Sequence, residues 1–232
     1  MCGRLVLFTT DEALLNATGE LPGVGAVRAP HATPPARYNL PPTAMVATVR
    51  LGPNTTGENP APHPARLEAL LEPARWGLIP QWKKDDSGPV LFNARGETVA
   101  DKPSFRAAFA SRRCVAPMDG YFEWRAKQPY FVHRDDGALL WAAGLWETGL
   151  DVLSTTIVTT AARAPIDWLH DRMPVLLTPH AAVNWCTGSA ADASALALNG
   201  EAETVSHLVT TPVGREVGNV KNDAPELLTP LA

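Results

Sequence analysis

Long apolar runs are missing from this sequence of 232 residues. Its longest apolar stretches, such as GALLWAAGLW, fall well short of the ~20 residues that a membrane-spanning helix needs. The first residues, MCGRLVLFTTDEALL, lack the long apolar core and the cleavage site of a signal peptide. We therefore expect a protein without membrane segments and with a cytoplasmic or nucleoid location.

Cysteine is scarce as well: the chain holds three, Cys2, Cys114 and Cys186, and no CxxC pair. An odd number without that spacing indicates neither a disulfide framework nor a zinc ribbon. The six histidines are scattered and add no metal-ligand spacing. The sequence therefore predicts reduced thiols, no bound metal and no cofactor.

No strong excess of one charge is present, since 20 Lys and Arg stand against 24 Asp and Glu, for a formal net charge of −4. A weakly acidic chain is not expected to bind nucleic acid over its whole surface. The charge is uneven, however, because residues 66–134 hold twelve basic and eight acidic side chains, a local excess of +4. A polyanion would bind in this region, although an ordinary mixed surface fits the count equally well.

Short strand-like runs separated by Gly, Pro and Asp-Gly turns dominate the chain. They are AMVATVR, RLEALLEPARW, the second half of SRRCVAPMDGYFEWR, PYFVHR, ALLWAAGLWE, DVLSTTIVTT and MPVLLT. Helices are predicted at residues 9–19, 102–113 and 178–186, and residues 21–43 are expected to form a long ordered loop. We predict an α+β fold of one domain, residues 1–232, on a curved, barrel-like, mainly antiparallel sheet with a few flanking helices and a loop-rich insertion at about residues 52–66.

The cysteine directly after the initiator methionine is chemically unusual. A small second residue permits removal of Met1, which would leave Cys2 with a free α-amine beside its thiol. In such a 1,2-aminothiol the amine has an ordinary pKa near ~8 and the thiol near ~8.5, so both are nucleophilic around neutral pH.

Polar residues also lie at the edges of the apolar runs LFNARGET, APMDGYFEWR and WLHDRMPVLL. Glu123 lies between two aromatic residues, where partial desolvation would suit a general acid; strand alternation would instead let it face water. His170 precedes a rigid proline-containing turn and could shuttle protons, or it could be a surface or capping residue.

Asn93 and Arg95 alternate on one face of a predicted strand and suit contact with phosphate or sugar oxygens. Alternatively, Arg95 forms a salt bridge with Glu97. Trp76 and the nearby Trp82 could stack on unpaired bases or fill the local core. None of these observations decides between its two interpretations.

The combination of eight sequence blocks, in this order along the chain, favours one interpretation. The blocks are MCGR, RYNLPPT, RWGLIPQW, NARGET with FR and RRC after it, APMDGYFEW, AGLWE, HDRMPVLL and VGNVKND. In this combination the chain resembles the SOS response-associated peptidase (SRAP) family over essentially its whole length. The resemblance implies that the protein shields abasic sites in single-stranded DNA. Departures are small: the pair before Glu123 is Tyr121-Phe122, and GPNTTGENPAPHPA looks like a lineage insertion.

The resemblance also implies a chemical role for Cys2. Its α-amine would condense with the aldehyde of a ring-opened abasic site to give a Schiff base, and its thiolate would then close a stable thiazolidine. Asn93 would lie near the reacting sugar, while Glu123 and His170 would transfer protons.

The DNA-binding residues implied by the resemblance are Arg4 and Arg95, which would bind backbone phosphates, and Trp76, which would lie beside the DNA path. The expected partner is single-stranded DNA containing abasic sites, bound by a monomer. Two alternatives remain open. Cys2 could be the nucleophile of an amidohydrolase or autoprocessing peptidase with its own amine as base, or it could be incidental in a noncatalytic single-strand binding module.

Overall fold

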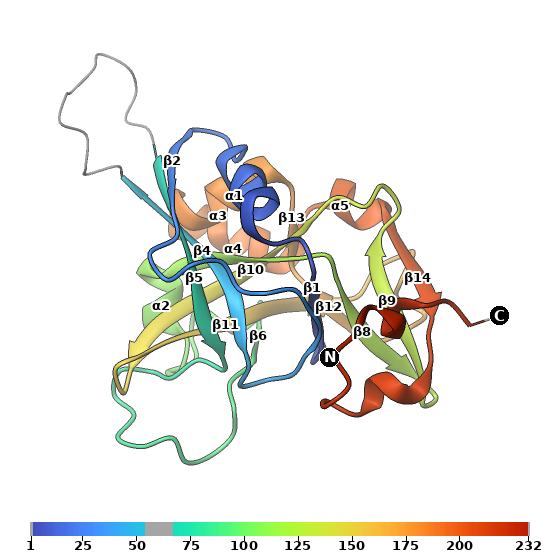
Figure 1. The fold of residues 1–232 in the computed structure, drawn as a ribbon. Helices are drawn as coiled ribbons and strands as arrows, with labels where there is room; N and C mark the ends of the chain where they lie inside the picture. Colours follow the sequence, from blue (N-terminus) through green and yellow to red (C-terminus); the bar gives the residue numbers. More distant parts are fainter. Residues whose placement is uncertain (1, 54–66, 232) are drawn as a thin grey trace.

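The computed structural model of the protein describes residues 2–53 and 67–231 (Figure 1). Most of the insertion predicted at about residues 52–66 lies outside these ranges. Among the helices of the described residues, none is both long enough and apolar enough to cross a membrane.

Strands form most of the structure. In chain order they are β1 (Leu5–Leu7), β2 (Val24–Arg28), β3 (Arg37–Leu40), β4 (Met45–Pro53), β5 (Leu67–Trp76), β6 (Asn93–Arg95), β7 (Arg113–Met118), β8 (Gly120–Arg125), β9 (Gln128–Arg134), β10 (Leu140–Gly149), β11 (Val152–Ala161), β12 (Arg172–Pro174), β13 (Leu176–Leu177) and β14 (Leu208–Pro212). They build a five-stranded sheet, in the order β14-β9-β8-β1-β3, and a nine-stranded sheet.

The nine-stranded sheet closes partly on itself. Its order is β12-β11-β10-β7-β4-β5-β2, with β13 added to β10 and β6 added to β11. β5 also pairs in parallel with β11, with Ser154 opposite Arg75 and Thr155 opposite Trp76. Because this pairing joins strands from distant places in the order, β11, β10, β7, β4 and β5 form a ring. The barrel-like, mainly antiparallel sheet predicted from the sequence is confirmed, in a mixed α and β fold of one domain.

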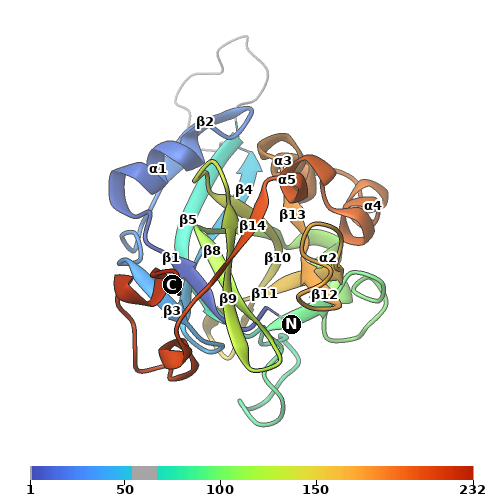
Figure 2. The same ribbon diagram turned by 90° about the vertical axis from the view of Figure 1, so that its right-hand side faces the viewer.

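Helices flank the sheets (Figures 1 and 2). They are α1 (Asp11–Gly19), α2 (Arg106–Ser111), α3 (Pro179–Thr187), α4 (Ala190–Asn199), α5 (Ala202–Ser206) and the 3-10 helices η1 (Arg215–Gly218) and η2 (Pro225–Leu228). The start of α3 follows from its sequence, since the Thr178 side chain accepts a hydrogen bond from the Ala181 amide and Pro179 lies in the first turn. The helices predicted at residues 9–19, 102–113 and 178–186 are confirmed as α1, α2 and α3, and α2 is shorter than predicted.

Some expectations were wrong. Residues 21–43 are not one irregular loop, because they contain β2 and β3, each paired with a distant strand. A helix was predicted to end at residue 113 and a strand was predicted only in the second half of residues 111–125, yet residues 113–118 form β7, in which every residue is buried. A strand covered on both faces lacks the alternation that marks an exposed strand, which explains the error.

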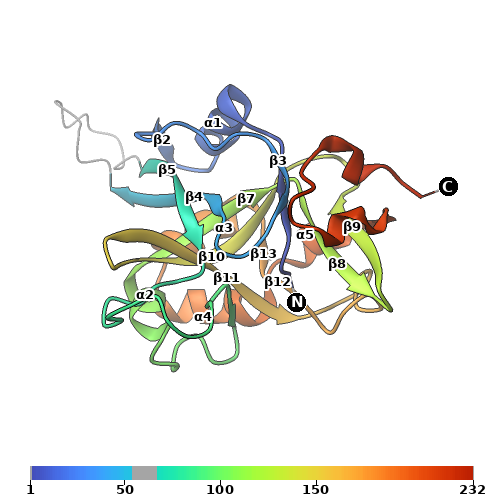
Figure 3. The same ribbon diagram turned by 60° about the horizontal axis from the view of Figure 1, so that its bottom comes forward.

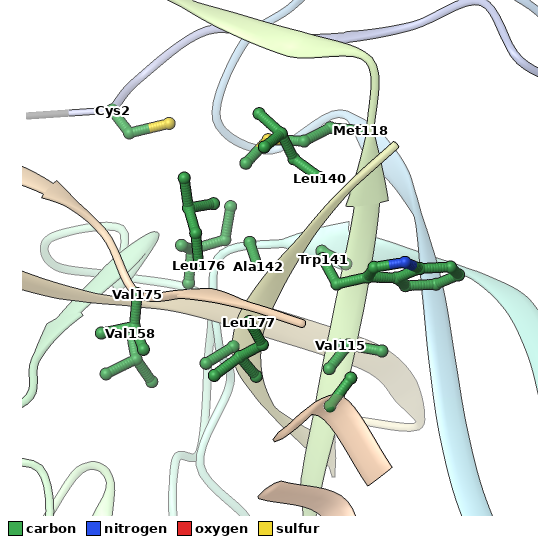
Figure 4. Close-up of a cluster of buried hydrophobic side chains, with 14 of the residues drawn as sticks. Cys2, Val115, Met118, Leu140, Trp141, Ala142, Val158, Val175, Leu176 and Leu177 are labelled. Atoms are coloured by element: carbon green, nitrogen blue, oxygen red, sulfur yellow. The ribbon is translucent and has the colours of Figure 1, made fainter. Parts of the chain in front are cut away.

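The core of the molecule lies inside the ring and beneath the helices. It includes Trp76, Trp185 and Met118, all fully buried, and Cys2 belongs to the same cluster of side chains. Figure 4 shows the Cys2 side chain directed toward Met118, Leu140 and Leu176. The amino terminus therefore contributes to the packed interior.

Candidate functional site

The position of Cys2 is set by the strand that follows it. β1 pairs antiparallel with β8, with Leu5 opposite Tyr121 and Val6 opposite Gly120. The Phe122 amide donates to the Arg4 carbonyl at 2.9 Å, which continues the pairing toward the amino terminus. Since a slip of one residue would turn every side chain to the other face, this register fixes Cys2 near the second half of β8, where Glu123 lies.

Asn93 holds Cys2 from the other sheet. Its side-chain Nδ2 donates a hydrogen bond to the Cys2 carbonyl oxygen at 2.8 Å. Its Oδ1 is buried and has no hydrogen-bond partner among the described residues. A buried acceptor without a partner is costly, so an amine or hydroxyl arriving here would be stabilised. Asn93 therefore joins Cys2 as predicted and offers one further acceptor beside it.

Glu123 is a buried carboxylate, since only 5 % of the residue is exposed. The expectation that strand alternation would turn it to water is therefore wrong, and its Oε1 accepts from the Trp124 amide at 3.2 Å. Desolvation by burial, followed by the negative charge of Glu123, raises the pKa of the Cys2 thiol well above its ordinary value. The two side chains are thus close enough to interact electrostatically, and the buried thiol is protonated at neutral pH.

Tyr121 completes this group, although the sequence analysis assigned it no role beyond its place in an aromatic pair. It is 1 % exposed. Desolvation raises the pKa of its phenol well above the ordinary value, and the charges of Cys2 and Glu123 act in the same direction. Its proximity to Cys2 depends on the β1–β8 pairing, which sequence spacing does not reveal.

His170 lies in the segment that leads into β12, and β12 runs close to the amino terminus in all three views (Figures 1, 2 and 3). Its Nδ1 accepts a hydrogen bond from the Arg172 amide at 2.9 Å, and the Asp171 carboxylate lies 2.7 Å from the same nitrogen. An amide donor needs Nδ1 as an acceptor, whereas a carboxylate acceptor needs a proton on Nδ1, so which of the two hydrogen bonds forms depends on the tautomer of the ring.

Arg4 is bound within the protein. Its guanidinium donates to Asn39 Oδ1 at 3.0 Å, to the Val217 carbonyl at 2.7 Å and to the Gly218 carbonyl at 3.2 Å. It also lies 5.8 Å from the centre of the Trp124 ring. Arg4 therefore fastens the strand that carries Cys2 to the carboxyl-terminal segment around η1, a structural role that the sequence did not suggest.

Trp76 is fully buried, so its ring has no exposed face on which a base could stack. Its Nε1 donates to the Phe92 carbonyl at 2.8 Å, and Phe92 directly precedes Asn93. The expected place beside the DNA path is corrected to a supporting one, behind the residue that contacts Cys2. The tryptophan of this segment with an accessible ring is Trp82, which is 64 % exposed.

Arg95 is exposed at the end of β6, on the same face as Asn93. The suggested salt bridge to Glu97 is not its contact, because Glu97 binds the guanidinium of Arg172 through both carboxylate oxygens. That hydrogen bonding lowers the pKa of the Glu97 carboxyl. Among the described residues, Arg95 makes no ion pair within the distance of a salt bridge, and its charge is available to a ligand.

Gly96 follows Arg95 for a steric reason. A Cβ at this position would lie 2.0 Å from the Ala197 carbonyl oxygen of α4, far inside van der Waals contact. The glycine lets β6 end against α4, which fixes the place of Asn93 and Arg95.

One group within the described ranges could hold a metal ion, formed by Asp135, Asp136 and His207. Its members are already paired: Asp136 binds Arg134, and the Asp135 carboxylate lies 3.0 Å from His207 Nδ1. The group lies outside the cluster around Cys2 and supplies no chemistry to it.

Known proteins are similar to this chain in sequence. The model of the SOS response associated peptidase (SRAP) family matches residues 1–220. The abasic site processing protein YedK of Escherichia coli is 33% identical, covering 100% of both chains, and the abasic site processing protein YoqW of Bacillus subtilis is 33% identical over 98% of this chain and 99% of its own.

Solved structures share the fold of this chain. A protein from Bacteroides thetaiotaomicron superposes with a TM-score of 0.76 at 19% identity over 100% of both chains, which shows the shared fold. A protein from Bordetella bronchiseptica gives a TM-score of 0.68 at 26% identity, covering 92% of this chain and 100% of its own. Because the family model and these relatives match nearly the whole chain, the chain belongs to the SOS response-associated peptidase family.

Proposed function

We propose that this protein captures abasic sites in single-stranded DNA by a covalent thiazolidine link to Cys2, after removal of Met1. The observation that carries the proposal is the contact of Asn93 with the Cys2 carbonyl, which leaves a buried acceptor, Asn93 Oδ1, beside the residue whose amine would react. Relatives that match nearly the whole chain are named abasic site processing proteins, which supports the same substrate.

The chemistry needs no co-reactant. The α-amine of Cys2 adds to the aldehyde carbon of the ring-opened sugar, and loss of water gives the imine. The thiol sulfur then adds to the imine carbon, while the thiol proton ends on the nitrogen. One C–N bond and one C–S bond form, one water leaves, and no atom is oxidised or reduced.

Glu123 is the proton-transfer group best placed for these steps. Opening the sugar ring and expelling water both require a proton to move between oxygen atoms, and a carboxylate close to Cys2 can provide it. Burial first, and then the charge of this carboxylate, raise the pKa of the Cys2 thiol and disfavour thiolate before the substrate arrives. An iminium cation formed beside the sulfur would act in the opposite direction and favour the thiolate, so sulfur attack would follow imine formation.

His170 would act as a second proton-transfer group. Its Nδ1 accepts from the Arg172 amide, and an imidazole can both accept and donate a proton near neutral pH. The fixed backbone contact gives the ring one orientation, which suits repeated proton transfer.

Binding of the strand would come from charge and stacking around this cluster. Arg95 would attract phosphates, and Arg4, although it is bound within the protein, would add positive charge next to Cys2. Trp82, exposed in the loop before β6, could stack on an unpaired base. We propose that the protein acts as a monomer on a single strand.

The amidohydrolase alternative is less well supported. A cysteine that attacks a carbonyl needs thiolate, whereas burial and Glu123 both disfavour thiolate at Cys2. A noncatalytic binding module would not need a buried carboxylate beside Cys2, because burial of such a group is costly.

The test is the replacement Cys2→Ala. It deletes the thiol that closes the ring and leaves an amine able to form only a reversible imine. We expect no heat-stable adduct with an abasic single strand on a denaturing gel, whereas borohydride should still trap the imine. A denaturation-resistant adduct of equal yield in Cys2→Ala without reductant would exclude the thiazolidine.

A further inference from the structure

An exposed tryptophan lies at the edge of the Cys2 cluster and takes no part in the function proposed above. Trp168, in the segment between β11 and β12, is 40 % exposed. The guanidinium of Arg125 lies 5.3 Å from the centre of its ring, and Tyr130 packs edge-on against it, with ring centres 5.1 Å apart. Two contacts on different strands thus hold a large apolar ring in partial contact with water.

The pairing of β8 and β9 relates Trp168 to Glu123. Tyr130 is the residue directly opposite Glu123 in this antiparallel pair, and directly opposite residues point their side chains to the same face. Arg125 lies two residues after Glu123 on β8 and shares that face. Trp168, which packs on both Tyr130 and Arg125, therefore lies at the rim of the face that carries Glu123, and it precedes His170 by two residues.

The charges around the ring favour an anionic ligand on one side. Arg125 and Lys127 are exposed at the β8–β9 hairpin, and neither forms a salt bridge with another described residue. The two-residue turn, Ala126 and Lys127, has φ values of 47° and 68°, the conformation that a tight hairpin requires and that non-glycine residues rarely adopt. Asp167, next to Trp168 in the chain, is exposed and opposes this charge.

From this geometry we propose that Trp168 and Arg125 form a stacking subsite for the base of a nucleotide adjoining the abasic one, with Arg125 and Lys127 contacting the neighbouring phosphates. Bases stack on aromatic rings and on guanidinium planes alike, and here the two are already in contact. An abasic nucleotide has no base of its own, so a flanking base is what could fix its position beside Cys2. The inference rests on the proposed function and adds to it a site for the flanking nucleotide.

The test combines protein and DNA changes. Binding is measured for single strands that carry a central tetrahydrofuran, an abasic analogue without an aldehyde, and for strands that also lack the base on one side or the other of it. Trp168→Leu keeps an apolar side chain on Tyr130 but removes the stacking surface. Leu150→Ala, in the turn between β10 and β11 and 38 % exposed in the native protein, is the matched control.

We expect Trp168→Leu to weaken binding about 10-fold or more and to lose most of the sensitivity to removal of one flanking base, while the control behaves as wild type. Asp167→Asn should tighten binding by reducing repulsion of the phosphates. Equal affinities of Trp168→Leu and wild type for every strand, or an equal loss on all strands whichever base is missing, would overturn the subsite.

The two proposals fail differently. Crosslinking of wild type to a natural abasic strand reports on Cys2 and does not require Trp168. Crosslinking with no flanking-base effect would refute the subsite alone. If wild type forms no crosslink at all, the proposed function itself is wrong, whatever the binding data show.

Discussion

Replacement of Glu123 by glutamine should change two properties of Cys2 in opposite directions. Glutamine is nearly isosteric, so it keeps the volume of a buried side chain and an acceptor for the Trp124 amide, which now lies 3.2 Å from Oε1. It removes the negative charge and the capacity to exchange a proton. The variant should therefore fold while losing the chemistry that we assign to the carboxylate.

The first effect is on crosslinking. General acid–base catalysis contributes roughly 10²–10⁴-fold, and we expect the rate of adduct formation to fall by that order. The second effect is on the thiol. Because the charge of Glu123 raises the pKa of Cys2, its removal lowers that pKa, and each unit corresponds to about a tenfold larger thiolate fraction at fixed pH, or ~1.4 kcal/mol. Alkylation of Cys2 should become faster as crosslinking becomes slower.

Both rates can be measured on the same preparations. Crosslinking is followed on denaturing gels at several pH values, and alkylation by iodoacetamide is followed at Cys2 by mass spectrometry of the peptides. Affinity for the tetrahydrofuran strand, measured in parallel, should stay near the wild-type value. His170→Ala should also slow crosslinking, and the double variant should lose less than the product of the two effects because both residues serve one proton-transfer sequence.

Wild-type crosslinking rates in Glu123→Gln across the pH range would refute the catalytic assignment. An unchanged or slower alkylation of Cys2 would refute the electrostatic one. A fall in both rates together with lost affinity would mean that the substitution had disturbed the site as a whole.

Two further predictions concern charge and pH. For an undamaged single strand, Arg95→Ala should reduce the slope of log affinity against log salt concentration by about 0.7, because one phosphate contact is lost. Arg28→Ala on β2, remote from the amino terminus (Figure 3), should leave the slope unchanged. Equal slopes for both variants would show that Arg95 is not part of the interface. In urea titrations the free energy of unfolding should fall as pH rises above ~9. Burial raises the pKa of Cys114 from 9.0 to about 12, so the unfolded chain releases this proton first and binds fewer protons than the folded one. Full ionisation would cost up to about 4 kcal/mol, and Cys114→Ala should show a shallower fall; a stability that is constant or rises from pH 9 to 11 would contradict the buried, neutral thiol.

Local signals predicted much of the fold. The threonine and proline at the start of α3 and the runs of β-branched and aromatic residues in β4, β9 and β11 act within a few residues, and the structure follows them. α4 was missed although a local signal exists: Ser189 and Asp192 form a capping box. The alanine-rich segment after it gave no clear amphipathic pattern. β2 and β3 could not be predicted, because each is stabilised by a partner strand far away in the sequence.

In the site, too, some features have a local signal in the sequence and others depend on distant parts of the chain. Cys2, Asn93, Glu123 and His170 could be singled out from the sequence, whereas Tyr121 could not, and the burial of these residues could not be assigned. Glu123 is buried on β8, a strand that lies between β1 and β9, and Trp76 is buried at the end of β5, where β5 pairs with β11. Arg4 contacts carbonyl groups more than two hundred residues away in the chain. These facts depend on long-range packing, which residue type and spacing do not specify.

The most direct test of the central claim is the intact mass of the wild-type protein, alone and after incubation with an oligonucleotide carrying one abasic site. We predict that the free protein lacks Met1 and that the adduct weighs the sum of protein and oligonucleotide less one water, without added reductant and after denaturation. Peptide mapping should place the adduct on Cys2. A protein that retains Met1 yet forms the same adduct, or an adduct mapped to another residue, would contradict capture by an amino-terminal cysteine.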